Sequence, residues 1–333
     1  MTPKQRIIPI FILHAGCEHK CVFCDQRLIT GADMPVIENG KLKIDNIDTV
    51  THPAQLAFYG GSFTAIPIDE QNKFLEAAQF FLELNELNSI RISTRPDYID
   101  EPTVNRLKSY GVGTIELGAQ SMCEDVLRAA HRGHTSSDTA RACELIKKSG
   151  LSLIVHMMTG LPEDTREKSL YTAKRIAELK PDGVRVHPTI VVRGTTLYEL
   201  WKRGDYKEHT IECAVDLCAE ICCIFSNAGI PVIRFGLNPS EPLSAGDAVA
   251  GAYHPAFGEL VYSRVYYNKA VALLQGIAPG SSVTLEVAPG QVSMMTGQHR
   301  CNIDALIKGF SLSSLKVIQS DLCLKGDVSI CCL

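Results

Sequence analysis

The stretch that decides the fold reads Cys17-Glu18-His19-Lys20-Cys21-Val22-Phe23-Cys24, and it follows directly on a strand-like run, Ile7–Leu13. Three thiolates at this spacing on one loop can reach three corners of a single cubane iron–sulfur cluster. Because only three ligands are local, the fourth iron would stay open to a small chelating molecule, as in catalytic metal sites. The stretch therefore predicts Cys17, Cys21 and Cys24 as the metal ligands, with the ring of Phe23 beside the cluster.

A zinc site is the alternative interpretation of the same stretch. Zinc prefers four ligands, and His14 or His19 could supply the fourth. The position of the stretch, at the end of the first strand of a repeating strand–helix array, favours the open iron–sulfur site.

Strand-like and helix-like runs alternate through the first two thirds of the chain. Short apolar or alternating runs predict six strands, at Ile7–Leu13, Gln55–Tyr59, Ser89–Thr94, Gly113–Ala119, Leu151–Met158 and Gly183–Ile190. Helices are expected between and after them, at Asp69–Asn85, Glu101–Ser109, Ser136–Ser149, Asp164–Leu179 and Glu208–Asn227, with Ser136 and Asp164 as N-caps. Repeated strand–helix crossovers imply a parallel sheet. The fold class is α/β, a partial (β/α)6 barrel resembling a TIM barrel, with a C-terminal α+β extension.

Polar residues recur at every second position of the later strands, which places them on one face. The alternating positions include Arg91 and Arg95, Glu116 and Gln120, and Arg185 and His187. The opposite faces are apolar and should pack against the helices. We therefore expect a polar lumen in which Glu116 pairs with Arg91 or Arg185, since an unpaired buried charge is costly.

The cysteine stretch resembles the cluster motif of the radical SAM superfamily, C-x3-C-x2-C with an aromatic residue before the third cysteine. The resemblance implies that S-adenosylmethionine (SAM) binds the open iron through its amino and carboxylate groups. A second match is Gly60-Gly61-Ser62 after the second strand, where the superfamily usually has Gly-Gly-Glu to hold the methionyl amino group. Here Ser62 replaces the acid, so backbone carbonyls and a hydroxyl would make that contact.

Active sites of such strand–helix arrays lie at the carboxyl ends of the strands. The residues that stand there in this sequence are expected to contact the cofactor. They are Thr94, Arg95, Gln120, Ser121, His156, Met158 and His187.

Three longer runs resemble the radical SAM domain of elongator protein 3, an enzyme family that modifies the wobble uridine of tRNA. These are His131-Arg132-Gly133-His134-Thr135, His156-Met157-Met158-Thr159-Gly160-Leu161-Pro162 and the run from Pro188 to Trp201. The resemblance covers roughly residues 7 to 204 and implies a substrate role for His134, Arg193 and Tyr198. Asp25-Gln26 departs from the family, which usually has a Pro–Gly-Gly run there. The residues after Phe235 do not resemble the acetyltransferase domain of that family.

Composition limits the partners and the compartment. Of 333 residues, 33 are Lys or Arg and 37 are Asp or Glu, so a net charge of −4 restricts any RNA contact to a concentrated basic patch. No apolar run approaches a membrane-spanning length, so no membrane partner is expected. Thirteen cysteines, an odd number without a secretory signal, predict reduced thiols and a cytoplasmic location.

The sequence thus predicts an enzyme with a radical SAM partial barrel at residues 1–235 and a C-terminal extension at 236–333 that could bind substrate. It would cleave SAM reductively at a 4Fe–4S cluster to a 5′-deoxyadenosyl radical, with tRNA as one candidate substrate and ferredoxin or flavodoxin as electron donor. The alternatives are a protein like the oxygen-independent coproporphyrinogen oxidase, and a non-catalytic zinc module that binds RNA.

Overall fold

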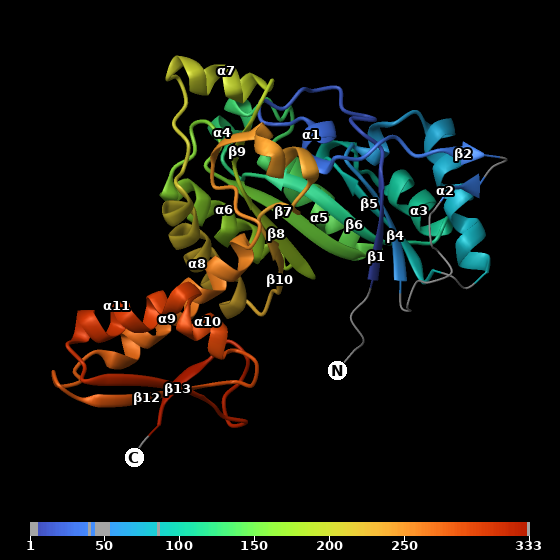
Figure 1. The fold of residues 1–333 in the computed structure, drawn as a ribbon. Helices are drawn as coiled ribbons and strands as arrows, with labels where there is room; N and C mark the ends of the chain where they lie inside the picture. Colours follow the sequence, from blue (N-terminus) through green and yellow to red (C-terminus); the bar gives the residue numbers. More distant parts are fainter. Residues whose placement is uncertain (1–5, 39–40, 44–53, 85–86, 332–333) are drawn as a thin grey trace. The chain divides into compact units, whose positions relative to one another are not determined.

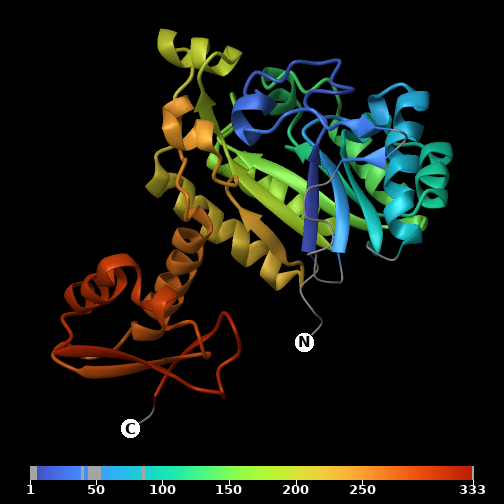
Figure 2. The ribbon, with the colours of Figure 1, turned by 45° about the vertical axis from the view of Figure 1, so that its right-hand side comes forward.

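A seven-stranded parallel sheet organises the larger part of the chain in the computed structural model, which describes residues 6–38, 41–43, 54–84 and 87–331 (Figure 1). Its strands follow the order β1, β4, β5, β6, β7, β8, β10. Their bounds are β1 Arg6–Phe11, β4 Ala54–Tyr59, β5 Ser89–Thr94, β6 Val112–Gln120, β7 Ser152–Thr159, β8 Gly183–Pro188 and β10 Val232–Phe235. The sheet curls into an open half-barrel (Figure 2). The α/β partial barrel is therefore confirmed, with one strand more than the six expected.

Helices connect the strands and cover the outer face of the sheet (Figures 1 and 2). They are α2 Ile68–Glu83, α3 Glu101–Ser109, α5 Ser136–Lys148 and α6 Arg166–Glu178, with the shorter α1 Gln26–Thr30, α4 Glu124–Ala129 and α7 Thr196–Arg203. Between sheet and helices lies an apolar layer in which Ile90, Ile92, Ile115, Leu117 and Val155 are fully buried. The apolar faces of the strands thus pack outward, which leaves the opposite faces to line the lumen.

Two predicted N-caps are wrong by one residue. The side chain of Thr135 caps α5 and forms a capping box with Asp138, and the side chain of Thr165 caps α6. A threonine hydroxyl can accept a hydrogen bond from the amide three residues on, so it competes successfully with Ser136 and Asp164 for the position. Asp164 instead accepts hydrogen bonds from the amide of Gly160 and the hydroxyl of Ser169. The predicted end of the second-strand helix, Asn85, lies outside the described residues.

The predicted strand Gly183–Ile190 is split in the structure. β8 ends at Pro188, and the chain continues as β9 (Ile190–Val192), which pairs antiparallel with β11 (Ala248–Gly251) outside the main sheet. Proline has no amide hydrogen and so ends a ladder inside a sheet. The last helix of the array, α8 (Ile211–Asn227), begins three residues later than predicted. A two-residue pair, β2 Ile37–Glu38 with β3 Lys41–Leu42, completes the strands of this part.

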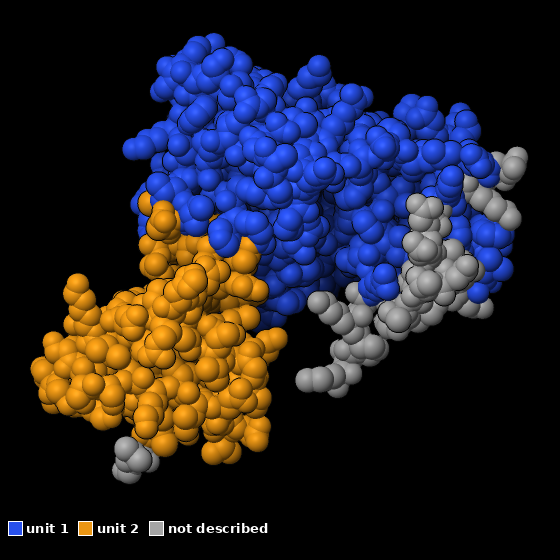
Figure 3. Space-filling model, in the orientation of Figure 1, with its two compact units in different colours: residues 1–211, 224–255 blue, residues 212–223, 256–333 orange. Residues whose placement is uncertain are grey.

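The chain divides into two compact units, residues 1–211 with 224–255, and residues 212–223 with 256–333 (Figure 3). The second unit contains α9 Phe257–Leu274, α10 Val292–Thr296 and α11 Cys301–Phe310 with a three-stranded sheet, β12 Ser282–Val287, β13 Ser314–Gln319 and β14 Val328–Ile330. Its core includes Tyr266, Leu285, Met295 and Leu306. This is the expected α+β extension. The domain boundary predicted between residues 235 and 236 stays a prediction.

No helix within the described ranges combines the length and apolar character needed to span a bilayer.

Candidate functional site

A cavity of about 910 Å³ opens in the lumen of the half-barrel, and the cysteine stretch forms part of its wall. All three cysteines of the motif line it, together with Phe23 and with Gly60-Gly61-Ser62 after β4. The residues predicted at the strand ends that also line it are Thr94, Arg95, Gln120, His156, Met158 and His187. One cavity therefore brings together nearly every residue that the sequence assigned to the cluster and to SAM.

The loop that carries the cysteines is fixed against the end of β4. The amide of His14 donates to the carbonyl of Gly60 over 2.8 Å, and the amide of Ser62 donates to the carbonyl of Ala15 over 2.8 Å. A Cβ atom on Gly61 would lie 2.4 Å from that same Ala15 carbonyl oxygen, which is too close for any side chain. Gly61 is therefore required because two backbone segments touch at this point.

The other side of the loop is held by the run His131–Thr135. A Cβ atom on Gly133 would lie 2.3 Å from the ring of His19, so the imidazole packs directly over this glycine. Arg132 donates from Nη1 to the Cys21 sulfur over 3.1 Å and from Nη2 to the carbonyl of Gly118 over 2.6 Å. The guanidinium thus ties the cysteine loop to β6.

Two polar side chains that the sequence analysis did not assign to the site contact the sulfurs of the cysteine motif. One is Arg132, and the other is Gln26, whose Nε2 donates to the Cys24 sulfur over 3.1 Å. The pattern that could have found Arg132 is the Arg-Gly-His-Thr run itself. Gln26 stands in the Asp25-Gln26 pair that departs from the family, and Asp25 caps α1.

All three thiols are partly removed from water, and burial changes the pKa of two of them, Cys24 and Cys17. Burial raises the pKa of Cys24 to about 12, and the charge of Cys21 contributes in the same direction. Burial likewise raises the pKa of Cys17. Negative charge on Cys21 or Cys17 would act in the same direction on the pKa of Cys24. A bound cation opposes these effects, since a coordinating thiol is deprotonated outright.

The motif offers three thiolate donors on one loop, which is a donor set that a cubane cluster can use. Within the described residues, no three Cys, His, Asp or Glu side chains are grouped to hold one metal ion. In a cubane, three cysteines bind three different irons, so their sulfurs stand further apart than the ligands of one ion. Three thiolate donors on one loop, with hydrogen-bond donors from Arg132 and Gln26 on the sulfurs, are suited to that arrangement.

The lumen wall below the loop carries a buried ionic network centred on Glu116, which is completely shielded from solvent. Its Oε1 accepts from Arg91 Nη1 over 2.5 Å and from Arg185 Nη2 over 3.2 Å. Its Oε2 lies 2.5 Å from His156 Nε2, and Tyr59 donates to Oε1 over 2.8 Å. The predicted pairing of Glu116 with a lumen arginine is confirmed, with both arginines as partners.

The electrostatics of this network favour the ionised carboxylate. Burial on its own would raise the pKa of Glu116. The hydrogen bond and charge of His156, and the charges of Arg185 and Arg91, outweigh it and hold that pKa well below its usual range. A carboxylate surrounded by cations stays charged at every ordinary pH.

The side chain of Ser62 is turned away from solvent. Its hydroxyl lies 3.1 Å from the hydroxyl of Thr94 and accepts from the amide of Arg95 over 3.3 Å. Arg95 in turn forms a bidentate pair with Asp97, over 3.0 and 2.6 Å. The substitution of serine for the usual acid is therefore accommodated by bonds between the ends of β4 and β5.

Four predicted site residues lie outside the lining of this cavity. Ser121 is buried against α6, with its hydroxyl 3.3 Å from that of Thr172, because Gln120 has a left-handed φ of +64° that ends the alternation of β6. Arg193 is exposed and pairs with Asp247, and Tyr198 stacks on Trp201. Their predicted roles toward cofactor and substrate stay predictions.

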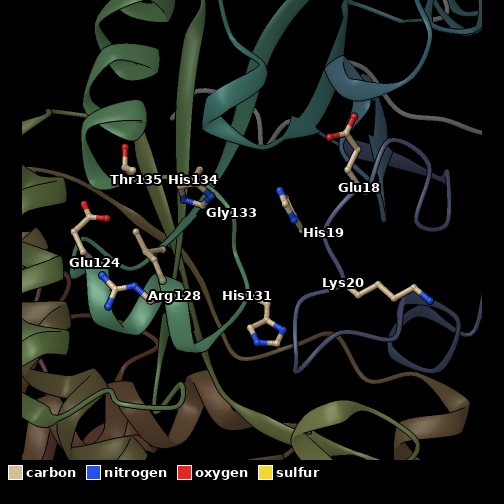
Figure 4. Close-up of a pocket in the computed structure, with 10 residues that line it drawn as sticks. Glu18, His19, Lys20, Glu124, Arg128, His131, Gly133, His134 and Thr135 are labelled. Carbon is tan, nitrogen blue, oxygen red and sulfur yellow. The ribbon is translucent and has the colours of Figure 1, made fainter.

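The fourth of these residues, His134, lines a separate pocket of about 610 Å³. Glu18, His19 and Lys20, from between the first two motif cysteines, form one side of it, and Glu124 and Arg128 of α4 form the other (Figure 4). The Nε2 atom of His134 lies 3.2 Å from the carbonyl oxygen of Ala119. Burial lowers the pKa of His134 to about 4, so its ring is neutral at physiological pH.

Comparison with known proteins agrees with this architecture. Residues 11–176 match the model of the radical SAM superfamily, and residues 181–267 match the radical SAM C-terminal domain. Among curated proteins, a tRNA uridine(34) acetyltransferase from Methanocaldococcus jannaschii is 33% identical over 301 residues, which cover 77% of this chain and 54% of that protein. Elongator complex protein 3 of Schizosaccharomyces pombe is 32% identical over 210 residues, 56% of this chain and 39% of that protein. The chain thus spans about half or less of the length of these relatives.

Solved structures give the same result. The elongator protein 3 of the archaeon Methanocaldococcus infernus, with an N-terminal deletion, superposes with a TM-score of 0.61 at 26% identity and covers 83% of this chain and 68% of that one. Coproporphyrinogen III oxidase of Escherichia coli superposes with a TM-score of 0.50 at 19% identity, over 68% of this chain and 53% of that one, which shows a shared fold alone. By its cysteine motif, its half-barrel and both family models, this chain belongs to the radical SAM superfamily and is an enzyme similar to the radical SAM region of elongator protein 3.

Proposed function

We propose that this protein is a radical SAM enzyme that binds a 4Fe–4S cluster through Cys17, Cys21 and Cys24 and acts on tRNA. The observation that carries the proposal is the single cavity shared by the three cysteines and by the polar strand ends. The relative named as a tRNA uridine(34) acetyltransferase supports tRNA as the substrate class. Bound there, the cluster and SAM together would supply a 5′-deoxyadenosyl radical once an electron is delivered.

The chain's own residues would position these groups and exclude water. Arg132 and Gln26 donate hydrogen bonds to motif sulfurs, which stabilises negative charge on them. Gly60, Gly61 and Ser62 line the cavity where the amino acid part of SAM is expected. The remainder of the cofactor would be contacted by the strand-end residues, which are Thr94, Arg95, Gln120, His156, Met158 and His187. Such a site orients the reactants while the cofactors carry the bond breaking.

The first experiment measures cluster binding. Each motif cysteine is replaced by alanine, the protein is reconstituted anaerobically, and iron, sulfide and zinc are measured per chain. We expect iron and sulfide to be lost with Cys17→Ala, Cys21→Ala or Cys24→Ala. The exposed Cys223 supplies the matched control, since Cys223→Ala should retain the cluster. Zinc bound at one ion per chain without sulfide would support the zinc module instead.

The second experiment measures turnover. Reconstituted protein is incubated with dithionite and SAM, and 5′-deoxyadenosine and methionine are quantified with and without bulk tRNA. Formation of both products, increased by tRNA, is the expected result, and flavodoxin or ferredoxin then replaces dithionite to test the electron donor. A chain that assembles the cluster and makes no 5′-deoxyadenosine would contradict the proposed reaction, and stimulation by a tetrapyrrole instead of tRNA would contradict the substrate.

A further inference from the structure

The cavity has an excess of positive charge that its own residues do not neutralise. Its charged lining consists of six arginines and one carboxylate, Glu116; the arginines are Arg6, Arg91, Arg95, Arg132, Arg185 and Arg234. Arg95 is paired with Asp97, which lies outside the lining, and Arg91 makes the shorter of the two arginine contacts with Glu116. The excess therefore remains on the wall formed by β8 and β10, where Arg185 and Arg234 lie.

Arg185 and Arg234 face each other across neighbouring strands, in register in the β8–β10 ladder. Like charges directly opposite each other in a sheet are destabilising. Arg185 shares the single carboxylate of Glu116 with Arg91, His156 and Tyr59. Arg234 forms no ion pair with any carboxylate of the residues that the structure describes. Arg185 and Arg234 are thus two adjacent cations, and the one carboxylate near them, that of Glu116, is shared with other groups.

Unsatisfied polar atoms lie at the same place. Nε of Arg185 and Nδ1 of His187 are both buried without a hydrogen-bond partner among the described residues. Burial lowers the pKa of His187 to about 3, and the positive charges of His156, Arg185 and Arg234 act in the same direction. Arg185 stands two positions before His187 on the same face of β8, and both residues line the cavity together with Arg234. Buried polar atoms are almost always paired, so atoms left unpaired beside a cavity indicate a ligand.

The cofactors of the superfamily would not remove the excess charge. A 4Fe–4S cluster with three thiolates carries net negative charge, and SAM carries net positive charge, so the two offset each other. The carboxylate of SAM is expected on the cluster iron, at the carboxyl ends of the strands. Arg185 lies three residues before Pro188, the end of β8, which is a depth of about 10 Å along the strand.

We propose that Arg185 and Arg234 form an anion site on the lumen wall that binds a carboxylate or phosphate group of a small co-substrate, with the free Nδ1 of His187 as a further hydrogen-bond partner. Guanidinium groups bind both kinds of oxyanion through paired hydrogen bonds. The assignment of this anion as a co-substrate rests on the proposed function, whereas the binding itself does not.

Binding of oxyanions to the full chain tests the proposal by calorimetry, before and after cluster assembly. The probes are malonate, inorganic phosphate and pyrophosphate, with chloride at equal ionic strength as the reference and a short single-stranded RNA as a further arm. We expect saturable binding of malonate or of the phosphates, and the preferred probe identifies the chemical class. Because the site does not require the cluster, a chain that binds the anion and fails to cleave SAM would separate this proposal from the proposed function.

The variants are chosen so that the fold is retained. Arg234 is half-buried and forms no ion pair with the described residues, so Arg234→Gln should fold normally and weaken anion binding at least about tenfold. Arg234→Lys should recover part of the affinity. Arg175→Gln, which removes an exposed arginine of α6, is the matched control and should bind as the parent does. The proposal is overturned by the absence of saturable binding, by equal affinity in Arg234→Gln, or by binding of RNA alone.

Discussion

Replacing Glu116 with glutamine should destabilise the half-barrel far more than any surface substitution of the same kind. The side chain is fully buried and faces Arg91 over 2.5 Å, Arg185 over 3.2 Å and His156 over 2.5 Å. Glutamine keeps the shape of the glutamate side chain and removes its negative charge. Its amide N–H group would then face one of the donors that now bind the carboxylate. Breaking a buried ion pair on one side costs about 3–5 kcal/mol, because the remaining charges stay buried without a partner. This is a large part of the roughly 5–15 kcal/mol that stabilises an ordinary domain.

Urea unfolding monitored by fluorescence measures the loss directly, since Trp201 is the single tryptophan of the chain and belongs to the unit that contains the sheet. The matched control is Glu178→Gln, which removes the same charge from an exposed pair with Arg175 and should cost at most about 1 kcal/mol. A double variant with Arg91→Gln should cost less than the sum of the two single variants. If Glu116→Gln lost no more free energy of unfolding than the control, the network would not be the buried, mutually dependent arrangement described above.

Three further outcomes follow from local geometry. Gly61→Ala should lower the free energy of unfolding by about 1–3 kcal/mol and impair cluster reconstitution, because its Cβ would meet two backbone oxygens. The control is Gly309→Ala, which has open space around it and should not lower the free energy of unfolding. Equal effects of the two substitutions would contradict the steric argument. Thr135→Ala should lower the free energy of unfolding by about 1 kcal/mol by removing the cap of α5, measured by urea unfolding; an unchanged midpoint would refute the capping role. The lowered pKa of His134, about 4, means that the neutral ring stabilises the fold above the ordinary histidine value of 6.5, and that this stability is lost as the pH falls from 6.5 toward about 4. His134→Gln should therefore flatten the pH dependence of the unfolding free energy in that window, and an unaltered slope would exclude His134 as its source.

Most of the half-barrel and of the cavity could be predicted from local sequence. The alternation of polar and apolar residues identified the lumen face of β5 to β8, and the cost of a buried charge predicted an arginine partner for Glu116, though not its contacts with His156 and Tyr59. Both signals lie within single strands, where side-chain direction follows directly from position.

The remaining features depend on contacts between distant segments. Arg132 meets Cys21 across 111 positions, so the Arg-Gly-His-Thr run can mark the arginine but does not indicate which atom it contacts. The seventh strand, β10, has only four residues and an irregular register against β8, so its alternation was too short to detect. Ser121 lies outside the lining of the cavity because a single left-handed residue, Gln120, ends the alternation of β6, and its predicted contact with the cofactor stays a prediction.

The contacts of Gly61 and Gly133 have a consequence for how metal enters the protein. The cysteine loop is held by backbone hydrogen bonds to the end of β4 and by the packing of His19, and none of these bonds involves a metal ligand group. We therefore expect the loop to keep its shape without a bound cluster, in contrast to zinc fingers, whose folding is driven by the ion itself. Iron and sulfide would then bind to a preformed site. Removal of the cluster by a chelator or by oxygen should leave a folded protein that can be reconstituted.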